Sequence, residues 1–324
     1  MRYYCTLFDK NYLYKGLSLY RSLADNGEKF TLWVLCLDDT TREVLEKLAY
    51  PGIKTITLAE FEDEGLKKAK KNRNLVEYYW TCTPSLLLYV MKKENLPELT
   101  YLDSDVFFFS GPQPVFDEIG NASVSIIGHR YSPEYEHYQK YGIYNVEWLT
   151  FRNDGEGMRC IEWWRERCLE WCYSRFENGK YGDQLYLNDW PERFRNVRVI
   201  AHKGAGVAPW NVKQYRIEER RGRVLIDEAE LIFYHFHEFQ LLEPGKFEYY
   251  GEGYRLQEDA RRLIYRPYEK SIQRSIAAVK RDFPYFDSGY KRALPKRRED
   301  RSYLMKLAVT VKGHLKRMAG VKNG

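Results

Sequence analysis

The chain has 324 residues, of which 44% are apolar and 30% charged, and this balance is that of a folded globular protein and not of a disordered one. Its net charge of +6 is uneven, because residues 261–324 hold 18 Lys and Arg against 5 Asp and Glu, whereas residues 1–260 hold 34 against 41. An acidic body argues against a protein that binds nucleic acid. The six cysteines form no CxxC pair and no apolar run approaches the length of a membrane span, so we expect a cytoplasmic protein without zinc sites or disulfides.

Apolar residues recur in the first hundred residues with the periods of strands and helices. The near-continuous apolar run TLWVLCL is typical of a strand buried on both faces of a parallel sheet. We expect a capping box of Thr40 and Glu43 to begin the helix after this run. The predicted elements are, in order, a strand at 2–8, a helix around 13–23, a strand at 31–37, a helix from about 40, a strand at 53–58 and a helix at 76–94. This strand–helix–strand order implies right-handed crossovers.

The next apolar run, YLDSDVFFF at 101–109, contains two aspartates one residue apart. An unpaired ionised carboxylate in apolar surroundings is costly, so we expect a positive partner beside Asp103 and Asp105. Carboxylates at this spacing near a strand end can hold Mg2+ or Mn2+, which in turn binds phosphate oxygens. A structural turn or a surface pair is the alternative. Phosphatases with a D-x-D-x-T/V motif are not indicated, because Phe107 occupies the last position, and the Gly-Ser pair of polymerase-like nucleotidyltransferases is missing upstream.

Beyond residue 120 the pattern is mixed, with strands predicted at 123–128, 143–151, 196–201 and 231–236 and a tryptophan-rich helix at about 157–176. In YGDQLYLNDW, Asp183 and Gln184 precede a short helix-like run, so Asp183 is expected to cap this helix, to face a cleft, or to do both. In HKGAGVAPWN, Gly204 and Gly206 either let backbone N–H groups approach an anion or form only a turn.

The late strand LIFYHFHEF places His235 and His237 on the same face. A lone histidine is more often structural than a metal ligand. At the end of a strand, in a chain that already offers two metal-binding aspartates, His235 is nevertheless a candidate third ligand. We expect His237 to be structural.

These motifs, in this order between residues 3 and 240, resemble the nucleotide-sugar glycosyltransferases of the GT-A fold, especially the retaining group that includes glycogenin and the bacterial lipopolysaccharide galactosyltransferases. The resemblance implies an α/β fold with a mixed, Rossmann-like central sheet flanked by helices. It implies a catalytic domain at 1–255, and we expect a basic helical C-terminal extension at 256–324.

The resemblance also implies roles for particular residues. Those assigned to the metal, Mn2+ or Mg2+, are Asp103, Asp105 and His235, with His202 of the HKGAGVAPW segment as an alternative third ligand. Those assigned to nucleotide-sugar binding are Thr6, Asp9, Tyr12, Asp103, Asn145, Trp210 and Asn211. Asp183 and Gln184 are assigned to catalysis, with Asp183 closest to the reacting carbon.

The chain departs from the family pattern at three places. Val146 and Glu147 stand where family members carry a small Ala-Gly pair, so the shape of the sugar pocket does not follow from the resemblance. The lysine usual in the helix before D-x-D is missing, and Thr81 or Thr83 is its candidate substitute. The late H-x-x-G-x-x-K-P-W motif is not intact.

The function that the resemblance implies is a metal-dependent hexosyltransferase that uses a UDP-sugar and retains its configuration. The acceptor is expected to be a glycan or a lipid-linked molecule. Apolar residues at helical spacing in 304–318, with lysines between them, predict either a helix that contacts the inner face of a membrane or a helix that packs on the body or forms a solvated end. The alternative function is a catalytically degenerate relative that binds a nucleotide or glycan and docks to membrane through its basic tail.

Overall fold

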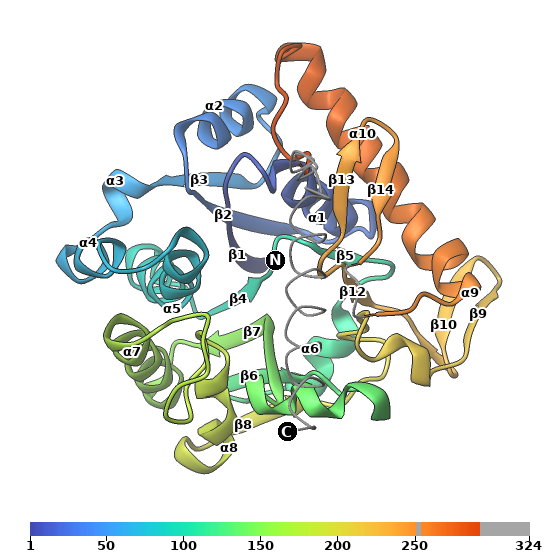
Figure 1. The fold of residues 1–324 in the computed structure, drawn as a ribbon. Coiled ribbons are helices and arrows are strands. Elements are labelled where there is room, and N and C mark those ends of the chain that lie inside the picture. Colours follow the sequence, from blue (N-terminus) through green and yellow to red (C-terminus); the bar gives the residue numbers. More distant parts are fainter. Residues whose placement is uncertain (251–253, 292–324) are drawn as a thin grey trace, which may run out of the picture. The chain divides into compact units, whose positions relative to one another are not determined.

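The computed structural model describes residues 1–250 and 254–291. Residues Met1–Tyr290 form one compact unit around a seven-stranded sheet of order β3-β2-β1-β4-β7-β6-β8 (Figure 1). Within this sheet β7 runs antiparallel to its neighbours β4 and β6, and the other pairs are parallel. The strands are β1 (Arg2–Phe8), β2 (Phe30–Cys36), β3 (Ile53–Thr57), β4 (Glu98–Leu102), β6 (Val124–Gly128), β7 (Tyr144–Arg152) and β8 (Val197–Ile200).

Helices cover both faces of the sheet (Figure 1). Successive residues of a strand point to opposite faces, so Val34 of β2 packs in one apolar core with Leu17, whereas Leu35 packs in a second core with Leu86. The helices of the first core are α1 (Leu13–Asp25), α2 (Asp39–Leu48), α6 (Gln113–Ile119) and α10 (Arg266–Asp282). Those of the second are α3 (Leu58–Phe61), α4 (Glu64–Lys70), α5 (Leu75–Glu94), α7 (Gly155–Glu170) and α8 (Trp190–Arg193).

The remaining elements belong to small sheets and short helices. Strand β5 (Val106–Phe108) pairs with β12 (Phe233–His235), and β13 (Gln240–Glu243) pairs with β14 (Lys246–Glu248). A three-stranded sheet consists of β9 (Ile217–Arg220), β10 (Arg223–Ile226) and β11 (Ala229–Glu230). The short helices are η1 (Pro133–Tyr141), η2 (Leu185–Asp189), η3 (Val212–Gln214), α9 (Glu258–Ala260) and the π-helix η4 (Arg261–Tyr265).

The fold class expected from the sequence is confirmed, and three local predictions are corrected. Helix α2 is capped by Asp38, whose side chain accepts a hydrogen bond from Thr41 N at 2.7 Å, so the Thr40–Glu43 capping box is wrong. The run 101–109 is two strands, because β5 turns away from the sheet after the aspartates. Helix α7 ends at Glu170, since Trp171 adopts an extended backbone.

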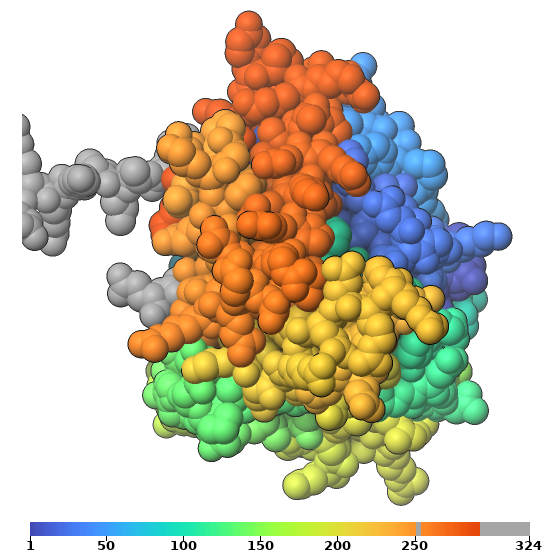
Figure 2. Space-filling view, turned by 90° about the vertical axis from the view of Figure 1, so that its right-hand side faces the viewer, coloured from blue at the N-terminus to red at the C-terminus, as the bar shows by residue number. Residues whose placement is uncertain are grey.

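The carboxyl-terminal helices of the described chain pack on the amino-terminal ones. Ser275 of α10 lies 3.2 Å from Ser18 of α1, hydroxyl to hydroxyl, and Figure 2 shows orange α10 on the surface beside the blue amino-terminal segment. The expected division at residue 255 stays a prediction, and residues 256–290 belong to the compact unit. The predicted membrane-contacting helix at 304–318 lies outside the described residues. Across 1–250 and 254–291, none of the helices combines the length and the apolar character needed to cross a membrane.

Candidate active site

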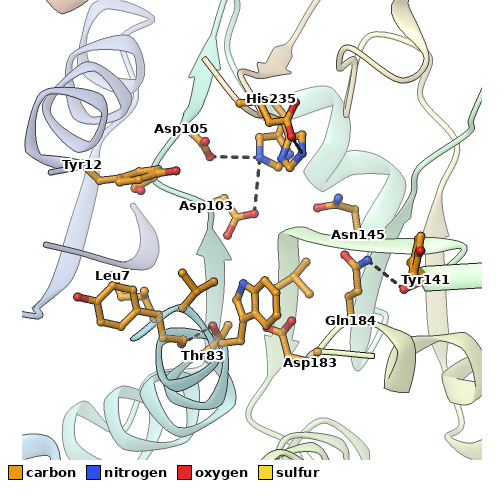
Figure 3. A pocket seen from close by; sticks show the side chains of 18 of the residues that line it. Leu7, Tyr12, Thr83, Asp103, Asp105, Tyr141, Asn145, Asp183, Gln184 and His235 are labelled. Carbon is orange, nitrogen blue, oxygen red and sulfur yellow. Dashed lines mark hydrogen bonds and ion pairs between the residues drawn. The ribbon is translucent and has the colours of Figure 1, made fainter. Parts of the chain in front are cut away.

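The two aspartates lie in the turn that connects β4 to β5. Parallel strand β4 ends at Leu102, so Asp103 and Asp105 stand at the carboxyl edge of the sheet, where α/β proteins bind ligands. Strand β5 pairs antiparallel with β12 in a register that places His235 opposite Val106. The backbone N–H of Phe236 donates to the carbonyl of Asp105 at 2.9 Å. Backbone pairing therefore brings His235 to the aspartates from about 130 residues away along the chain (Figure 3).

The side chains of this trio converge. His235 Nε2 lies 3.1 Å from Asp105 Oδ1 and 3.8 Å from Asp103 Oδ2. One potential ligand atom from each residue falls within 4.8 Å of the others, which is the spacing of a group able to share one ion. Two carboxylate oxygens and an imidazole nitrogen suit a divalent ion such as Mn2+ or Mg2+. The residues present therefore fit a divalent metal.

Of the two histidines considered as third ligand, His235 is the one that the structure brings to the aspartates. His202 Nδ1 accepts a hydrogen bond from Gly204 N at 3.1 Å, and His202 lies outside the group of potential ligands. His237 lies nearby, with its ring centroid 5.9 Å from that of His235. Burial, together with the charge of the nearby His235, lowers the pKa of His237 to about 4.

The charges around the trio are strongly coupled. Burial raises the pKa of Asp103 to about 6 even though His235 opposes this rise. Burial also acts to raise the pKa of Asp105, but His235 and Lys15 outweigh it and hold that pKa below its ordinary value. Burial acts to lower the pKa of His235, and Asp105 and Glu147 outweigh it, so that this pKa is raised. A compact group of carboxylates beside one imidazole attracts a cation.

Two charged residues that sequence reasoning did not assign lie directly behind the trio. Lys15 of α1 is buried, and its Nζ lies 3.6 Å from Asp105 Oδ2 and 4.1 Å from the centroid of the Tyr12 ring. Glu147 of β7 is fully buried, and its Oε2 lies 2.7 Å from His235 Nδ1. In the sequence, each appears as a charged residue within an otherwise apolar strand or helix face. Such a residue indicates that a charged partner exists but does not identify the partner.

The trio opens into a cavity of about 760 Å3. With 28% of its side chain exposed against 10% for Asp105, Asp103 is the aspartate that faces this cavity more openly. The predicted site residues that line it are Asp9, Tyr12, Asp103, Asp105, Asn145, Asp183, Gln184, Trp210 and His235. The predicted residues Thr6, Asn211 and His202 are not among its lining residues. Of the two threonines considered for the missing lysine, Thr83 lines the cavity and Thr81 donates to Glu77 O at 2.8 Å.

The segment after β1 contributes Asp9 and Tyr12 to the cavity lining. Asp9 is held in place, because its carboxylate accepts hydrogen bonds from Asn11 N at 2.9 Å and from the Tyr79 hydroxyl at 3.1 Å. Tyr12 is 42% exposed at the start of α1, so its ring offers an open aromatic face. Thr6, by contrast, is fully buried within β1.

Asp183 and Gln184 also line the cavity. Gly182 has φ +53, and a Cβ built there would meet Trp80 at 3.3 Å, so glycine permits the turn that presents Asp183. Burial raises the pKa of Asp183 to about 8, helped by the charge of Asp103. Gln184 Nε2 donates to Tyr141 O at 3.0 Å. Asp183 does not cap the following helix, since Gln184 precedes η2 and no side chain caps it.

Asn145 and Asn211 anchor the walls of the cavity. Asn145 Oδ1 accepts from Glu147 N at 2.7 Å, and Asn145 Nδ2 lies 2.8 Å from His129 Nε2. Asn211 Nδ2 donates to His129 O and Gly206 O, both at 2.8 Å, which fixes the loop that carries Trp210.

The glycines of the 202–211 loop allow close packing. A Cβ at Gly204 would lie 1.9 Å from Glu230 O, and Gly204 O accepts a hydrogen bond from Ile232 N at 2.8 Å. Gly206 has φ +66, and a Cβ there would lie 2.7 Å from Glu147 Oε1. Both glycines therefore permit close packing of this loop, and the approach of an anion to their backbone N–H groups stays a prediction.

Aromatic side chains form much of the remaining wall. The Tyr141 and Tyr181 ring centroids are 4.6 Å apart, and Tyr131 stacks on His129 with centroids 4.7 Å apart. The aromatic wall consists of Trp80, Tyr131, Tyr138, Tyr141, Tyr181, Trp210 and Tyr254. Such rings offer flat apolar faces with polar edges, which suit sugar rings.

The fold of the chain is similar to that of a solved structure. The chain resembles the structure of the galactosyltransferase LgtC in complex with donor and acceptor sugar analogs, with a TM-score of 0.51 at 14% identity over 90% of this chain and 97% of that one. At this identity the likeness shows the fold, which is the GT-A glycosyltransferase fold.

Relatives in sequence are closer. The uncharacterized protein YfnD of Bacillus subtilis (strain 168) is 35% identical over 300 residues, covering 90% of this chain and 96% of YfnD. The uncharacterized protein YfnF of the same strain is 34% identical over 254 residues, covering 76% of this chain and 84% of YfnF. No protein-family model matches the chain. By its sequence, the chain belongs to the family of YfnD and YfnF.

Proposed function

We propose that the chain is a metal-dependent glycosyltransferase that moves a hexose from a UDP-sugar, with retention of configuration, to a glycan or lipid-linked acceptor. The observation that carries this proposal is the convergence of Asp103, Asp105 and His235 on one point at the edge of a cavity that also contains Asp183. The GT-A fold supports it, because the carboxyl edge of its sheet is where the trio lies.

The proposed metal site serves the leaving group. Asp103, Asp105 and His235 would hold a divalent ion, Mn2+ or Mg2+, and their fixed backbone leaves little reorganisation to be done during the reaction. When bound, such an ion supplies Lewis-acid stabilisation of the negative charge that develops on the departing diphosphate.

Residues of the chain would bind and orient the donor around that point. The Asp9 carboxylate, already held by Asn11 and Tyr79, is an acceptor suited to a base N–H, and the exposed Tyr12 ring can stack on the base. Asn145 and Gln184 would bond sugar hydroxyls. Asp183 would stabilise the oxocarbenium-like sugar or bond its hydroxyls, and its position as a buried residue lining the same cavity as the trio supports this role.

The aromatic wall supports a sugar-containing acceptor. Stacking of a sugar ring on Tyr138 or Tyr141 would bury apolar C–H surface and exclude water from the reacting centre. An acceptor attached to a lipid and a peripheral position on the inner face of the membrane remain proposals that rest on the basic composition of the carboxyl-terminal residues.

A thermal-shift panel with UDP, in the presence and absence of Mn2+, tests the proposal. A ligand that binds the folded state raises the melting temperature by mass action, so UDP with Mn2+ should stabilise the wild-type chain. The metal-dependent part of this shift should vanish in Asp105→Ala and persist in Asp25→Ala, which removes an exposed aspartate at the far end of α1. Release of UDP from UDP-hexoses should then follow in the wild type. Binding of UDP without metal and without turnover would favour the non-catalytic alternative.

A further inference from the structure

Glu147 is an unusual residue for its place in the fold. It lies within β7, a strand whose residues 145–151 are all buried, and its own side chain is fully buried. A buried carboxylate without a charged partner is strongly unfavourable. Within the described parts of the chain, no Lys or Arg forms an ion pair with Glu147, and the group that meets it is the His235 ring, with Nδ1 2.7 Å from Oε2.

The two ring nitrogens of His235 thus face different groups. Nδ1 faces Glu147. Nε2 faces Asp105 at 3.1 Å and Asp103 at 3.8 Å (Figure 3). A neutral imidazole can offer a lone pair at one nitrogen only while the other carries the proton. A carboxylate beside Nδ1 selects the tautomer with the proton at Nδ1 and leaves the Nε2 lone pair directed at the aspartates.

The structure holds Glu147 where this selection requires it. The Glu147 carbonyl accepts a hydrogen bond from Asp103 N at 3.2 Å, and Glu147 N donates to Asn145 Oδ1 at 2.7 Å. Gly206 leaves room for the carboxylate, because a Cβ there would approach Glu147 Oε1 to 2.7 Å. The aspartate turn and the β7 asparagine therefore fix the backbone of Glu147, and the glycine loop leaves space for its carboxylate.

We infer that Glu147 is a positioning residue, which orients His235 so that its Nε2 completes a divalent-metal site with Asp103 and Asp105. The inference rests on the proposed function and deepens it, since it assigns a role to a side chain that itself touches neither metal nor donor. Carboxylates that hold a ligating histidine in other proteins change metal affinity when they are removed.

The affinity for Mn2+ tests this inference without reference to activity. The electron paramagnetic resonance signal of free aqueous Mn2+, titrated into the full chain with UDP present and corrected for the Mn2+ that UDP binds in a titration without protein, gives the dissociation constant. Glu147→Gln keeps the shape and loses the charge, and Glu147→Ala loses both. We expect affinity for Mn2+ to fall by about 10- to 100-fold, with the larger loss in the alanine variant.

The matched control is Glu77→Gln. Glu77 is another buried glutamate, but its carboxylate accepts hydrogen bonds from Ser174 N at 2.9 Å and from Asn74 N at 2.9 Å and does not contact the trio. This variant should lose stability and keep its affinity for Mn2+. If the Glu147 variants fold and bind Mn2+ as tightly as the wild type, Glu147 is only a structural residue and the inference is overturned.

A measurement on the wild type keeps the inference testable if the variants do not fold. Spectra of 15N-labelled histidine in the presence of Mg2+ and UDP should show His235 with its proton at Nδ1 and none at Nε2. The opposite tautomer would overturn the inference and leave the proposed function standing. If metal binding depends on Glu147 but the chain turns over no UDP-hexose, the inference is supported and the proposed function is contradicted. If the wild type binds no divalent ion, both are overturned.

Discussion

The two ends of the cavity are built in different ways. At the proposed metal end, backbone hydrogen bonds between neighbouring strands place Asp103, Asp105 and His235, and buried Lys15 and Glu147 lie behind them. At the end proposed to hold the sugar, Asp183 and Gln184 come from a loop, and much of the wall consists of partly exposed aromatic rings. A strand ladder tolerates little change, whereas a loop can vary in sequence without disturbing the sheet. We therefore propose that the metal end serves a fixed reaction step and that the sugar end sets the choice of donor and acceptor.

Substitution at the metal end should have the largest effect. Asp105→Asn keeps the shape of the side chain but weakens the proposed metal site, so we expect release of UDP from UDP-hexose to fall by about 100- to 1,000-fold. The Mn2+-dependent rise in melting temperature should be lost as well. An Asp105→Asn variant that retains both would show that the trio is not the metal site.

Substitution of Asp183 should affect catalysis without affecting metal binding, and so distinguish the two ends of the cavity. We expect Asp183→Asn to lower kcat by about 100-fold, because the carboxyl group proposed to bond the sugar hydroxyls or to stabilise the oxocarbenium-like sugar is lost, while the thermal shift with Mn2+ and UDP stays as in the wild type. Initial rates and melting curves measured on the same samples check this. Loss of the metal-dependent shift would mean that Asp183 belongs to the metal end.

Asp183 should also leave a signature in the pH dependence of stability. Burial raises the pKa of its carboxyl from 3.8 to about 8, so the folded chain holds a proton there that the unfolded chain releases. This contribution to stability is fully present below pH 3.8 and is lost as the pH rises toward 8. Urea unfolding of the metal-free chain should show this decline with pH in the wild type and a smaller decline in Asp183→Asn. Identical slopes would contradict the burial of an ionisable group at this position.

The glycine loop behind the metal end should be intolerant of side chains. Gly206→Ala adds a Cβ 2.6 Å from Ile127 and 2.7 Å from Glu147, at φ +66, so we expect it to cost about 2–4 kcal/mol of unfolding free energy. Gly222→Ala is the control, because Gly222 has φ +75 but nothing within 4 Å of the added Cβ, and it should cost only about 1 kcal/mol. Equal losses of unfolding free energy in the two variants, measured by urea unfolding, would show that the loop can rearrange to accommodate the added Cβ.

The smallest effect is expected at the aromatic wall. Tyr138→Ala removes one ring, and at about 0.5–1.5 kcal/mol per ring the KM for a glycan acceptor should rise by about 2- to 12-fold with the UDP shift unchanged. Tyr285→Ala, at a side chain that is 95% exposed and outside the cavity, should change neither quantity. An unchanged acceptor KM in Tyr138→Ala would place the acceptor elsewhere.

Much of the fold could be predicted because its signals are local. The near-continuous apolar run of β2 and the helical spacing of α1 depend on residues only one to four positions apart. The boundaries were less accurate where two residues could serve as the cap, as when Asp38 and not Thr40 begins α2. The break between β4 and β5 was missed, because the apolar run gives no sign that the second half pairs with β12.

The site was predictable where a short motif carries it. Asp103 and Asp105 are read from one segment, and His235 from its place at the end of a late strand. Lys15 and Glu147 could not be assigned, because their partners are 90 and 88 residues away and the contacts depend on how α1 and β7 pack beside the turn. A charged residue in a buried segment indicates that a partner exists, and only the fold identifies it.

The central claim, that Asp103, Asp105 and His235 hold one divalent ion, is tested most directly by crystals soaked with Mn2+ and UDP. We predict an anomalous difference peak bonded to carboxylate oxygens of both aspartates and to His235 Nε2, with diphosphate oxygens on its open side. A well-occupied nucleotide with no such peak beside this trio would contradict the account.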